Sequence, residues 1–94
     1  MHTYPKIRAV TPLGDCRLRV TFDNDVCKIY DCKPLLRKPV FAPLANDWLF
    51  RTVQVDPGGY GVSWNEDIDL AESELWKHGI TVETAQSAVA LVRS

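Results

Sequence analysis

Residues 50–79 constrain the fold more than any other part of the chain. The run FRTVQV (50–55) is followed by DPGGY (56–60) and then by GVSW (61–64). Proline followed by glycine is typical of a tight turn, so this pattern predicts a β-hairpin. The glycines lie between two strands and lack the spacing of a phosphate-binding loop.

The same segment ends in a predicted helix near residues 70–78. Asp69 is placed to act as the N-cap, with Glu72 at the third helical position, because side-chain oxygens there accept hydrogen bonds from free backbone N–H groups. Gly79 is placed to end the helix. Helix-start electrostatics explains much of the acidic cluster between residues 66 and 74, so we do not expect a metal site there.

A first hairpin is predicted for residues 17–22 (RLRVTF) and 27–31 (CKIYD), where apolar and polar side chains alternate. A two-residue turn would pair Phe22 with Cys27 and place the apolar side chains of both strands on one face. That register puts a polar set on the opposite face, namely Arg17, Arg19, Thr21, Lys28 and Tyr30.

The remaining segments complete an α+β domain. Residues 6–10 form a plausible first strand, and residues 32–45 hold three prolines, which favour short helical turns at 34–38 and 42–46 over one long helix. We therefore predict a small antiparallel sheet built from two hairpins plus an N-terminal strand, with short helical turns between the hairpins and one capped helix. Residues 1–79 form the single domain.

Residues 80–94 are predicted to be a C-terminal extension, weakly helical or mobile. Within it, Ala85, Ala88, Val89 and Val92 recur at helical spacing. Alanine buries little area, so this helix is marginal on its own. The segment has three alternatives open to it: docking on the domain, packing against a second copy, or remaining mobile.

Composition bounds the classes of function. The chain has 94 residues and a formal net charge of −1, which fits one domain and argues against a generic binder of phosphate backbones. The N-terminus lacks the apolar core of a signal peptide, and no apolar run approaches the length of a membrane span. We expect a cytoplasmic protein without a membrane association.

Catalytic or cofactor chemistry has little support in the sequence. The three cysteines contain no C-x-x-C, and only two histidines are present. No metal-ligand set or nucleophile–base pair stands out, and cysteine is often a small buried apolar residue. We expect no enzyme activity, no metal and no cofactor.

Four separated blocks carry a resemblance to a known family: FDND (22–25), YDCKPLL (30–36), PVFAPL (39–44) and WNEDIDL (64–70). Their order resembles that of the bacterial domain of unknown function 2442, over about residues 5–78. Asp25 stands where that family usually has glycine in the hairpin turn, and Asn65 where proline is frequent.

The resemblance implies a small α+β domain with no established activity. Some relatives carry an appended helix-turn-helix, and such proteins are often met beside another short reading frame, which implies regulation or pairing of the toxin–antitoxin kind. Fifteen residues follow Gly79, too few for such an appendage. Any such role would use the core domain or a partner.

Our main hypothesis is a non-catalytic binding module for protein–protein interaction or regulatory pairing, with an unknown protein or as a homodimer. Aromatic residues are enriched in binding hot spots. The candidate partner-binding residues are Trp76, Tyr60, Val89 and Val92, whereas Trp48 and Trp64 are expected in the core.

The alternative hypothesis is a nucleic-acid-binding regulator. It would use the polar face of the first hairpin, where basic side chains flank an aromatic ring suited to base stacking. The net charge disfavours it, so nucleic acid is the less expected partner. Its candidate residues are Arg17, Arg19, Lys28 and Tyr30.

Overall fold

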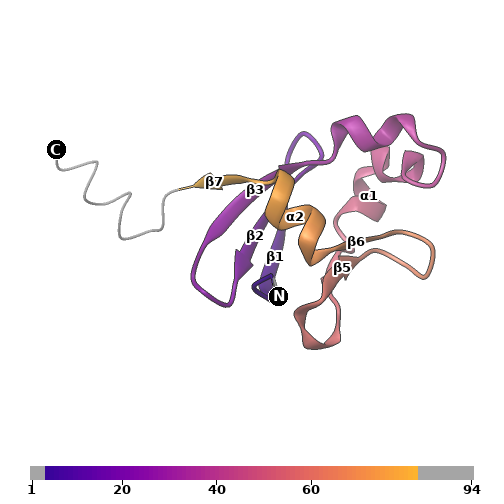
Figure 1. Cartoon of the computed structure of the whole chain (residues 1–94). Coiled ribbons are helices and arrows are strands. Elements are labelled where there is room, and N and C mark those ends of the chain that lie inside the picture. The colour runs from indigo at the N-terminus through magenta and orange to yellow at the C-terminus, as the bar shows by residue number, and fades with distance from the viewer. Residues whose placement is uncertain (1–3, 83–94) are drawn as a thin grey trace, which may run out of the picture.

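The structure, a computed structural model, describes residues 4–82 and confirms the α+β class (Figure 1). It contains two antiparallel sheets. The first has the order β1-β2-β3-β7, with bounds Ile7–Leu13, Arg17–Phe22, Cys27–Asp31 and Ile80–Val82. The second has the order β4-β5-β6, with bounds Gln54–Val55, Gly61–Ser63 and Asp69–Ala71.

Short helices connect and cover the sheets. The predicted proline-rich turns are present as 3₁₀-helices, followed by one turn of α-helix before β4. The bounds are η1 Lys33–Arg37, η2 Ala42–Ala45, α1 Asp47–Phe50, η3 Pro57–Gly59 and α2 Glu72–His78. Prolines stand at the first turns of η1, η2 and η3, where the missing N–H has no intrahelical partner to lose.

The core lies between one face of the four-stranded sheet, the three-stranded sheet and α2. We call this side of the four-stranded sheet the inner face. It carries Leu18, Val20 and Phe22, all fully buried. Trp76 of α2 meets Phe22 edge-to-face, with ring centroids 5.0 Å apart. Tyr30 of β3, only 4% exposed, is part of the same core.

The predicted register of the first hairpin is wrong by one residue. Thr21 pairs with Cys27 and Val20 with Lys28. The turn has three residues instead of two: the Phe22 N–H donates to the Val26 carbonyl at 2.9 Å, the Asp25 N–H donates to the Phe22 carbonyl at 3.0 Å, and Asp25 adopts a left-handed conformation (φ 69°). Loops of this type add a bulge and shift the pairing.

The shift exchanges the two faces of β3. Because side chains alternate along a strand, Lys28 and Tyr30 lie on the inner face, and Cys27 and Ile29 lie on the outer face with Arg17 and Arg19. The predicted grouping of all four candidate nucleic-acid residues on one face is therefore wrong.

The predicted helix start at Asp69 is also wrong. Residues 69–71 form β6, which pairs with β5 through Val62 and Leu70, and Leu70 is buried. Helix α2 begins at Glu72, after Ala71, which provides no side-chain cap. Burial of Leu70 beside β5 outweighs the capping preference of Asp69. Gly79 ends the helix as predicted, and its N–H donates to the Leu75 carbonyl.

The second hairpin is shorter than predicted. Its strands are β4 and β5, and Phe50 belongs to α1 instead of a strand. The Gly58-Gly59 turn is present with φ values of 79° and 77°. A Cβ on Gly59 would lie 2.6 Å from the Ile7 carbonyl oxygen, so glycine allows the turn to approach β1.

Residues 80–82 do not belong to an extension. They form β7, which pairs with β3 through Ile80–Ile29 and Val82–Cys27 and extends the first sheet. Because the strand has three residues, it is too short for alternation to reveal it in the sequence. The predicted helical segment 84–93, with Val89 and Val92, lies outside the described residues.

Candidate partner-binding site

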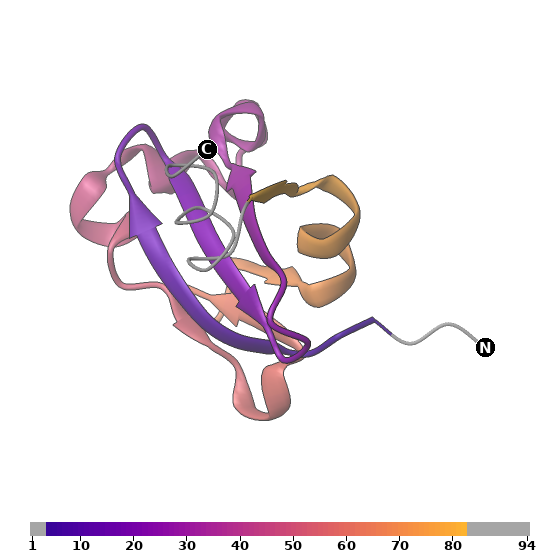
Figure 2. The ribbon, with the colours of Figure 1, turned by 90° about the vertical axis from the view of Figure 1, so that its left-hand side faces the viewer.

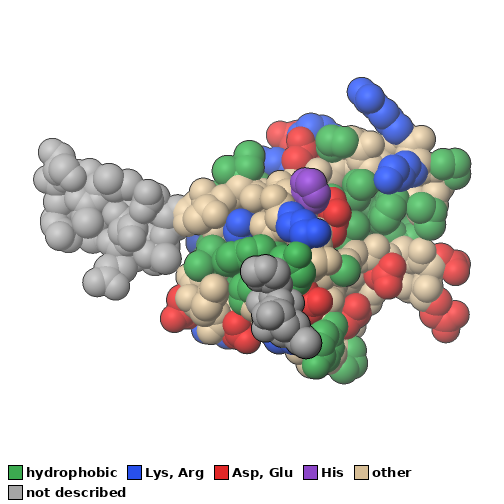
Figure 3. Space-filling model, in the orientation of Figure 1, with side chains coloured by type: hydrophobic (Ala, Val, Ile, Leu, Met, Phe, Trp, Pro, Cys, Tyr) green, Lys and Arg blue, Asp and Glu red, His purple; other side chains and the backbone are tan. Residues whose placement is uncertain are grey.

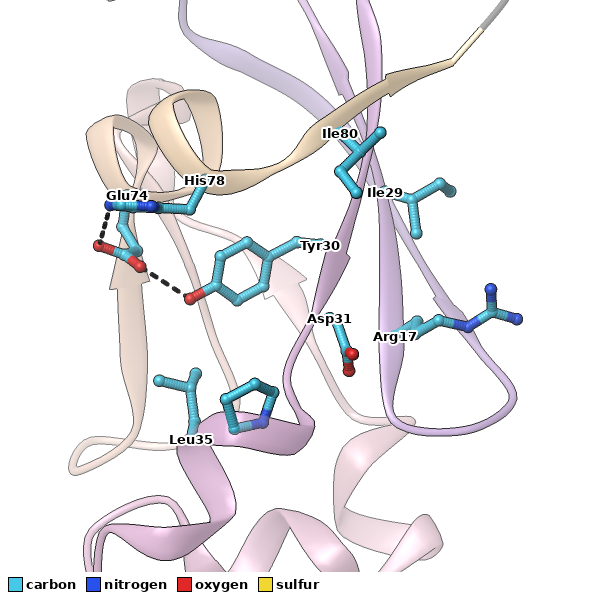
Figure 4. Close-up of a pocket in the computed structure, with 9 residues that line it drawn as sticks. Arg17, Ile29, Tyr30, Asp31, Leu35, Glu74, His78 and Ile80 are labelled. Atoms are coloured by element: carbon cyan, nitrogen blue, oxygen red, sulfur yellow. Dashed lines mark hydrogen bonds and ion pairs between the residues drawn. The ribbon is translucent and has the colours of Figure 1, made fainter.

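A hollow of about 520 Å³ opens at the edge of the four-stranded sheet, where β7 stops (Figure 4). We call it the edge hollow. β3 supplies one side, η1 the second and the end of α2 with β7 the third. Its lining residues are Arg17, Ile29, Tyr30, Asp31, Pro34, Leu35, Glu74, His78 and Ile80.

The hollow exists because β7 covers only part of β3. Pairing stops at Ile29 and Ile80, because the residue before Ile80 is Gly79, which ends helix α2. β3 continues through Tyr30 and Asp31 along β2. The last residues of β3 therefore have no strand beside them on that edge among residues 4–82.

The backbone of Asp31 points into this gap. Near both ends of the β2–β3 pair, hydrogen bonds join the Phe22 N–H to the Val26 carbonyl and the Cys32 N–H to the Cys16 carbonyl, each 2.9 Å long. In antiparallel strands, every second residue bonds to the same neighbour. The even-numbered residues of β3 therefore face β2, and the N–H and C=O of Asp31 face the hollow.

Polar side chains at the hollow are linked to one another. The Tyr30 hydroxyl donates to Glu74 Oε2 at 2.8 Å, and His78 Nε2 lies 3.9 Å from Glu74 Oε1. Figure 4 shows the Tyr30 ring reaching across the hollow toward α2. Burial, and then the hydrogen bond to Glu74, raise the pKa of Tyr30 above its ordinary value. Tyr30 is thus a neutral donor at neutral pH.

Apolar side chains complete the lining. Ile80 is 73% exposed, whereas Ile29 and Leu35 are half-buried. The combination of apolar contacts, one free pair of backbone groups and a few fixed polar atoms suits binding through an extended chain segment. It supplies no activated nucleophile.

Lys28 has a structural role. Its ammonium donates to the Trp76 carbonyl at 2.7 Å and lies 4.2 Å from the centre of the Trp76 ring. A cation near the end of a helix is favourable because it meets free carbonyl groups. Lys28 therefore ties β3 to the last turn of α2, and it points away from Arg17 and Arg19.

The other predicted aromatic residues are dispersed. Trp76 is half-buried against Phe22, and Tyr60 is 61% exposed with Lys6 Nζ 4.5 Å from its ring centre. Neither lines the edge hollow. Trp64 is buried as predicted, and its indole N–H donates to the Phe50 carbonyl at 3.0 Å.

The prediction that Trp48 is buried is wrong. Its side chain is 85% exposed on α1. The asparagine before the helix, Asn46, accepts a hydrogen bond from the Trp48 N–H and fixes the helix start, so the indole projects outward. In the view of Figure 3, hydrophobic side chains form a group at the surface where η1, η2 and α1 lie in Figure 1.

The three cysteines are free thiols. Burial raises the pKa of Cys16, and burial raises the pKa of Cys32 to about 12. Both are therefore protonated at neutral pH and are poor nucleophiles. Residues 4–82 also contain no group of three or more side chains able to hold a metal ion.

Sequence reasoning found only part of the site. The sequence predicts Arg17 and Tyr30 on one polar face, and the structure places them on opposite faces beside the same hollow. Glu74, His78 and Ile80 were missed as site residues. The four-residue spacing of Glu74 and His78 on one helix could have indicated that they meet.

No helix in the described part of the chain has the length and apolar character needed to cross a membrane. Neither a curated protein nor a solved structure gives a significant match to the chain. Residues 7–81 match a family described as "Protein of unknown function (DUF2442)", and this match includes every strand of both sheets except the last residue of β7. The chain therefore belongs to the DUF2442 family.

Proposed function

We propose that this protein is a non-catalytic interaction module that binds a short extended segment of a partner protein in the edge hollow. The observation that carries the proposal is the open edge of β3, where Asp31 presents its backbone groups beside exposed apolar side chains. Adding a strand to a free sheet edge gives main-chain hydrogen bonds, and neighbouring pockets select the side chains.

The hollow specifies the kind of segment that fits. A residue paired with Asp31 would place its own side chain on the outer face beside Ile29 and Ile80, so an apolar residue is favoured there. The hollow is short, so the segment would supply two to four residues to it, on the order of 100 Å³ or more each. Such a contact suits reversible pairing.

In this proposal the module acts in the bacterial cytoplasm as one half of a regulatory pair, of the toxin–antitoxin kind or with a second copy of itself. Small size and the lack of activated side chains among residues 4–82 support a binding role. Nucleic-acid binding is less favoured, because Lys28 and Tyr30 point away from Arg17 and Arg19.

The test compares two substitutions at the same residue. Asp31→Pro removes the N–H that faces the hollow, and Asp31→Ala keeps it while removing the same carboxylate. The tagged full-length protein and both variants are used to capture proteins from a lysate of the source cells, with nuclease present. We expect one protein to be retained by wild type and Asp31→Ala and lost from Asp31→Pro.

A second pair of variants is independent of backbone changes. Ile80→Asp alters the lip of the hollow, and Thr81→Asp adds the same charge on the next residue of β7, on the other face of the sheet. Both side chains are exposed, so neither change should unfold the domain. Affinity for the captured protein should fall roughly tenfold for Ile80→Asp only.

Three outcomes would contradict the proposal. The first is equal capture by both Asp31 variants, and the second is loss of capture in Trp48→Ala while the Asp31 and Ile80 variants retain it. The third is recovery of nucleic acid, and of no protein, when nuclease is omitted. The last would favour the alternative at Arg17 and Arg19. Circular dichroism of each variant separates loss of binding from loss of folding.

A further inference from the structure

Two exposed hydrophobic side chains lie at one end of the molecule. They are Val40, 48% exposed between η1 and η2, and Trp48, 85% exposed on α1. The other large hydrophobic side chains exposed within residues 4–82 lie elsewhere, because Ile80 lines the edge hollow and Tyr60 lies beside Lys6. Val40 and Trp48 therefore mark an apolar surface that the described part of the chain leaves uncovered.

Basic side chains lie on one side of this apolar surface. Arg37 is the last residue of η1 and Lys38 follows it, and both are exposed. Neither takes part in an ion pair within residues 4–82. Their two positive charges are therefore free to meet a partner.

Acidic side chains lie on the other side. Glu66 and Asp67 are exposed in the loop between β5 and β6, and neither forms an ion pair with a residue of the described chain. Trp64, at the start of this loop, donates its indole N–H to the Phe50 carbonyl of α1 at 3.0 Å. The acidic loop therefore lies beside α1.

The apolar surface lies between the two charged groups. η1 contacts η2, and η2 contacts α1. Figure 3 shows the same order at the right-hand end of the molecule, with Lys and Arg at the top, hydrophobic side chains in the middle and Asp and Glu at the bottom. In Figure 2, α1 lies behind the four-stranded sheet, at the far end from its outer face. We call this region the end surface and define it by Arg37, Lys38, Val40, Trp48, Glu66 and Asp67.

We propose that the end surface binds the end surface of a second copy of this chain, as a two-fold symmetric dimer. Two-fold symmetry brings the same patch of both copies together and makes every contact reciprocal. An axis through the apolar middle places Arg37 and Lys38 of each copy opposite Glu66 and Asp67 of the other. Opposite charges are then matched twice, and Trp48 of each copy is covered.

The two signs of charge favour a second copy over a partner of one sign. Nucleic acid would be attracted by Arg37 and Lys38 but repelled by Glu66 and Asp67. An acidic peptide would meet the same repulsion. Tryptophan and arginine are enriched among the residues that dominate protein–protein binding, and complementary charges fix the orientation of the two partners. The end surface has both features.

Sedimentation velocity of the full-length protein over a range of concentrations tests the proposal. One variant, Arg37→Glu/Lys38→Glu, reverses the basic side, and a second, Glu66→Lys/Asp67→Lys, reverses the acidic side. We expect a dimer for wild type and a dissociation constant at least about a hundredfold higher for each variant, because like charges then face each other. An equimolar mixture of the two variants should dimerise again, since every opposed pair regains opposite charges.

Two controls separate the interface from general effects of charge and of exposed aromatic area. Arg19→Glu/Lys77→Glu makes the same change in net charge at exposed residues outside the end surface, and it should dimerise as wild type does. Trp48→Ala should raise the dissociation constant at least about tenfold, whereas Tyr60→Ala should leave it unchanged. Circular dichroism confirms that each variant is folded.

Several results would overturn the proposal. They are a wild type that stays monomeric at about 1 mM, which corresponds to weak association, a dimer that both charge reversals leave intact, and a mixture of the two variants that stays monomeric. Wild-type species larger than a dimer would also overturn it, because head-to-tail contacts that do not close continue to grow.

This inference is independent of the proposed function. No residue of the end surface lines the edge hollow. Asp31→Pro should therefore dimerise as wild type does, and both charge variants should still capture the partner protein. The two proposals can fail separately.

Discussion

The two faces of the four-stranded sheet differ in what fixes them. The inner face buries Leu18, Val20 and Phe22 completely and is closed by Trp76 of α2. The outer face carries Ile29 and Ile80 opposite each other, and the second of these is 73% exposed. The comparison shows that alternation alone identifies an apolar face of a strand but not which face becomes the core.

The largest expected effect is on the free energy of unfolding, which should fall more when a side chain is truncated on the inner face than on the outer face. Phe22→Ala should lower the free energy of unfolding by about 3–5 kcal/mol, because it removes a fully buried ring and leaves a cavity. Ile29→Ala, on the half-buried outer face, should cost less than about 2 kcal/mol. Urea denaturation followed by circular dichroism measures both.

If Phe22→Ala fails to fold, Phe22→Leu provides a smaller change at the same position and should still cost more than Ile29→Ala. Equal costs on the two faces would contradict the assignment of the inner face as the core, or would show that the outer face is buried to the same degree.

Alkaline pH should lower the free energy of unfolding through ionisable groups that are buried on the inner face. The unfolded chain releases the Cys32 proton near its ordinary pKa of 9.0, whereas burial raises the pKa of folded Cys32 to about 12. The unfolded state therefore binds fewer protons above pH 9, and the free energy of unfolding falls as pH rises from 9 to 12. By pH 10 this loss is on the order of 1 kcal/mol.

Urea titrations at pH 8 and pH 10 measure the change. Cys32→Ala, compared with wild type at both values, should reduce the difference between them even though the variant is less stable overall. Tyr30 adds to the loss at higher pH, because its pKa is also raised by burial. An unchanged difference in Cys32→Ala would show that Cys32 ionises equally in both states.

The hydrogen bond at the edge hollow should have a smaller effect. Tyr30→Phe removes the donor to Glu74 and should lower the free energy of unfolding by about 1 kcal/mol, since Glu74 remains 41% exposed and water can replace the donor. Tyr60→Phe is the matched control, because Tyr60 is 61% exposed, and it should change stability little. Thermal denaturation of both variants checks the difference.

The elements with clear local signals were predictable. Alternating residues gave the two strands of the first hairpin, and prolines at 34 and 43 indicated the short helical turns. Strands β6 and β7 have three residues each, too few for a period to appear, and both are recruited by neighbouring strands. Tertiary pairing overrode the capping signal at Asp69.

The edge hollow was beyond sequence reasoning for the same reason. Its walls come from β3, η1, α2 and β7, and its opening depends on where β7 stops pairing. The one-residue error in register then placed Tyr30 on the wrong face. The turn separates the predicted arrangement from the observed one: it has three residues, and Asp25 has a positive φ whereas Asn24 does not.

The smallest expected effect concerns Asp25, because its turn sets the register that decides which side chains of β3 lie on the inner face. Asp25→Gly should raise the free energy of unfolding by up to about 1 kcal/mol, because glycine adopts φ near 69° without the cost that a Cβ imposes. The gain is reduced by loss of the exposed Arg8–Asp25 ion pair (2.8 Å), which contributes little. Asp25→Ala loses the same ion pair but keeps the cost, so it should not stabilise.

Register is measured in the same variants through the contact between the α-protons of Thr21 and Cys27. These residues oppose each other at a position where the strands approach closely, so this contact should be strong. If Asp25→Gly stabilises and keeps the contact, the three-residue turn determines which face of β3 is buried. The other outcome is that this contact disappears and Phe22 opposes Cys27 instead. Packing of Tyr30 against α2 would then be too weak to hold the register. The turn residue alone would decide which face of β3 is buried.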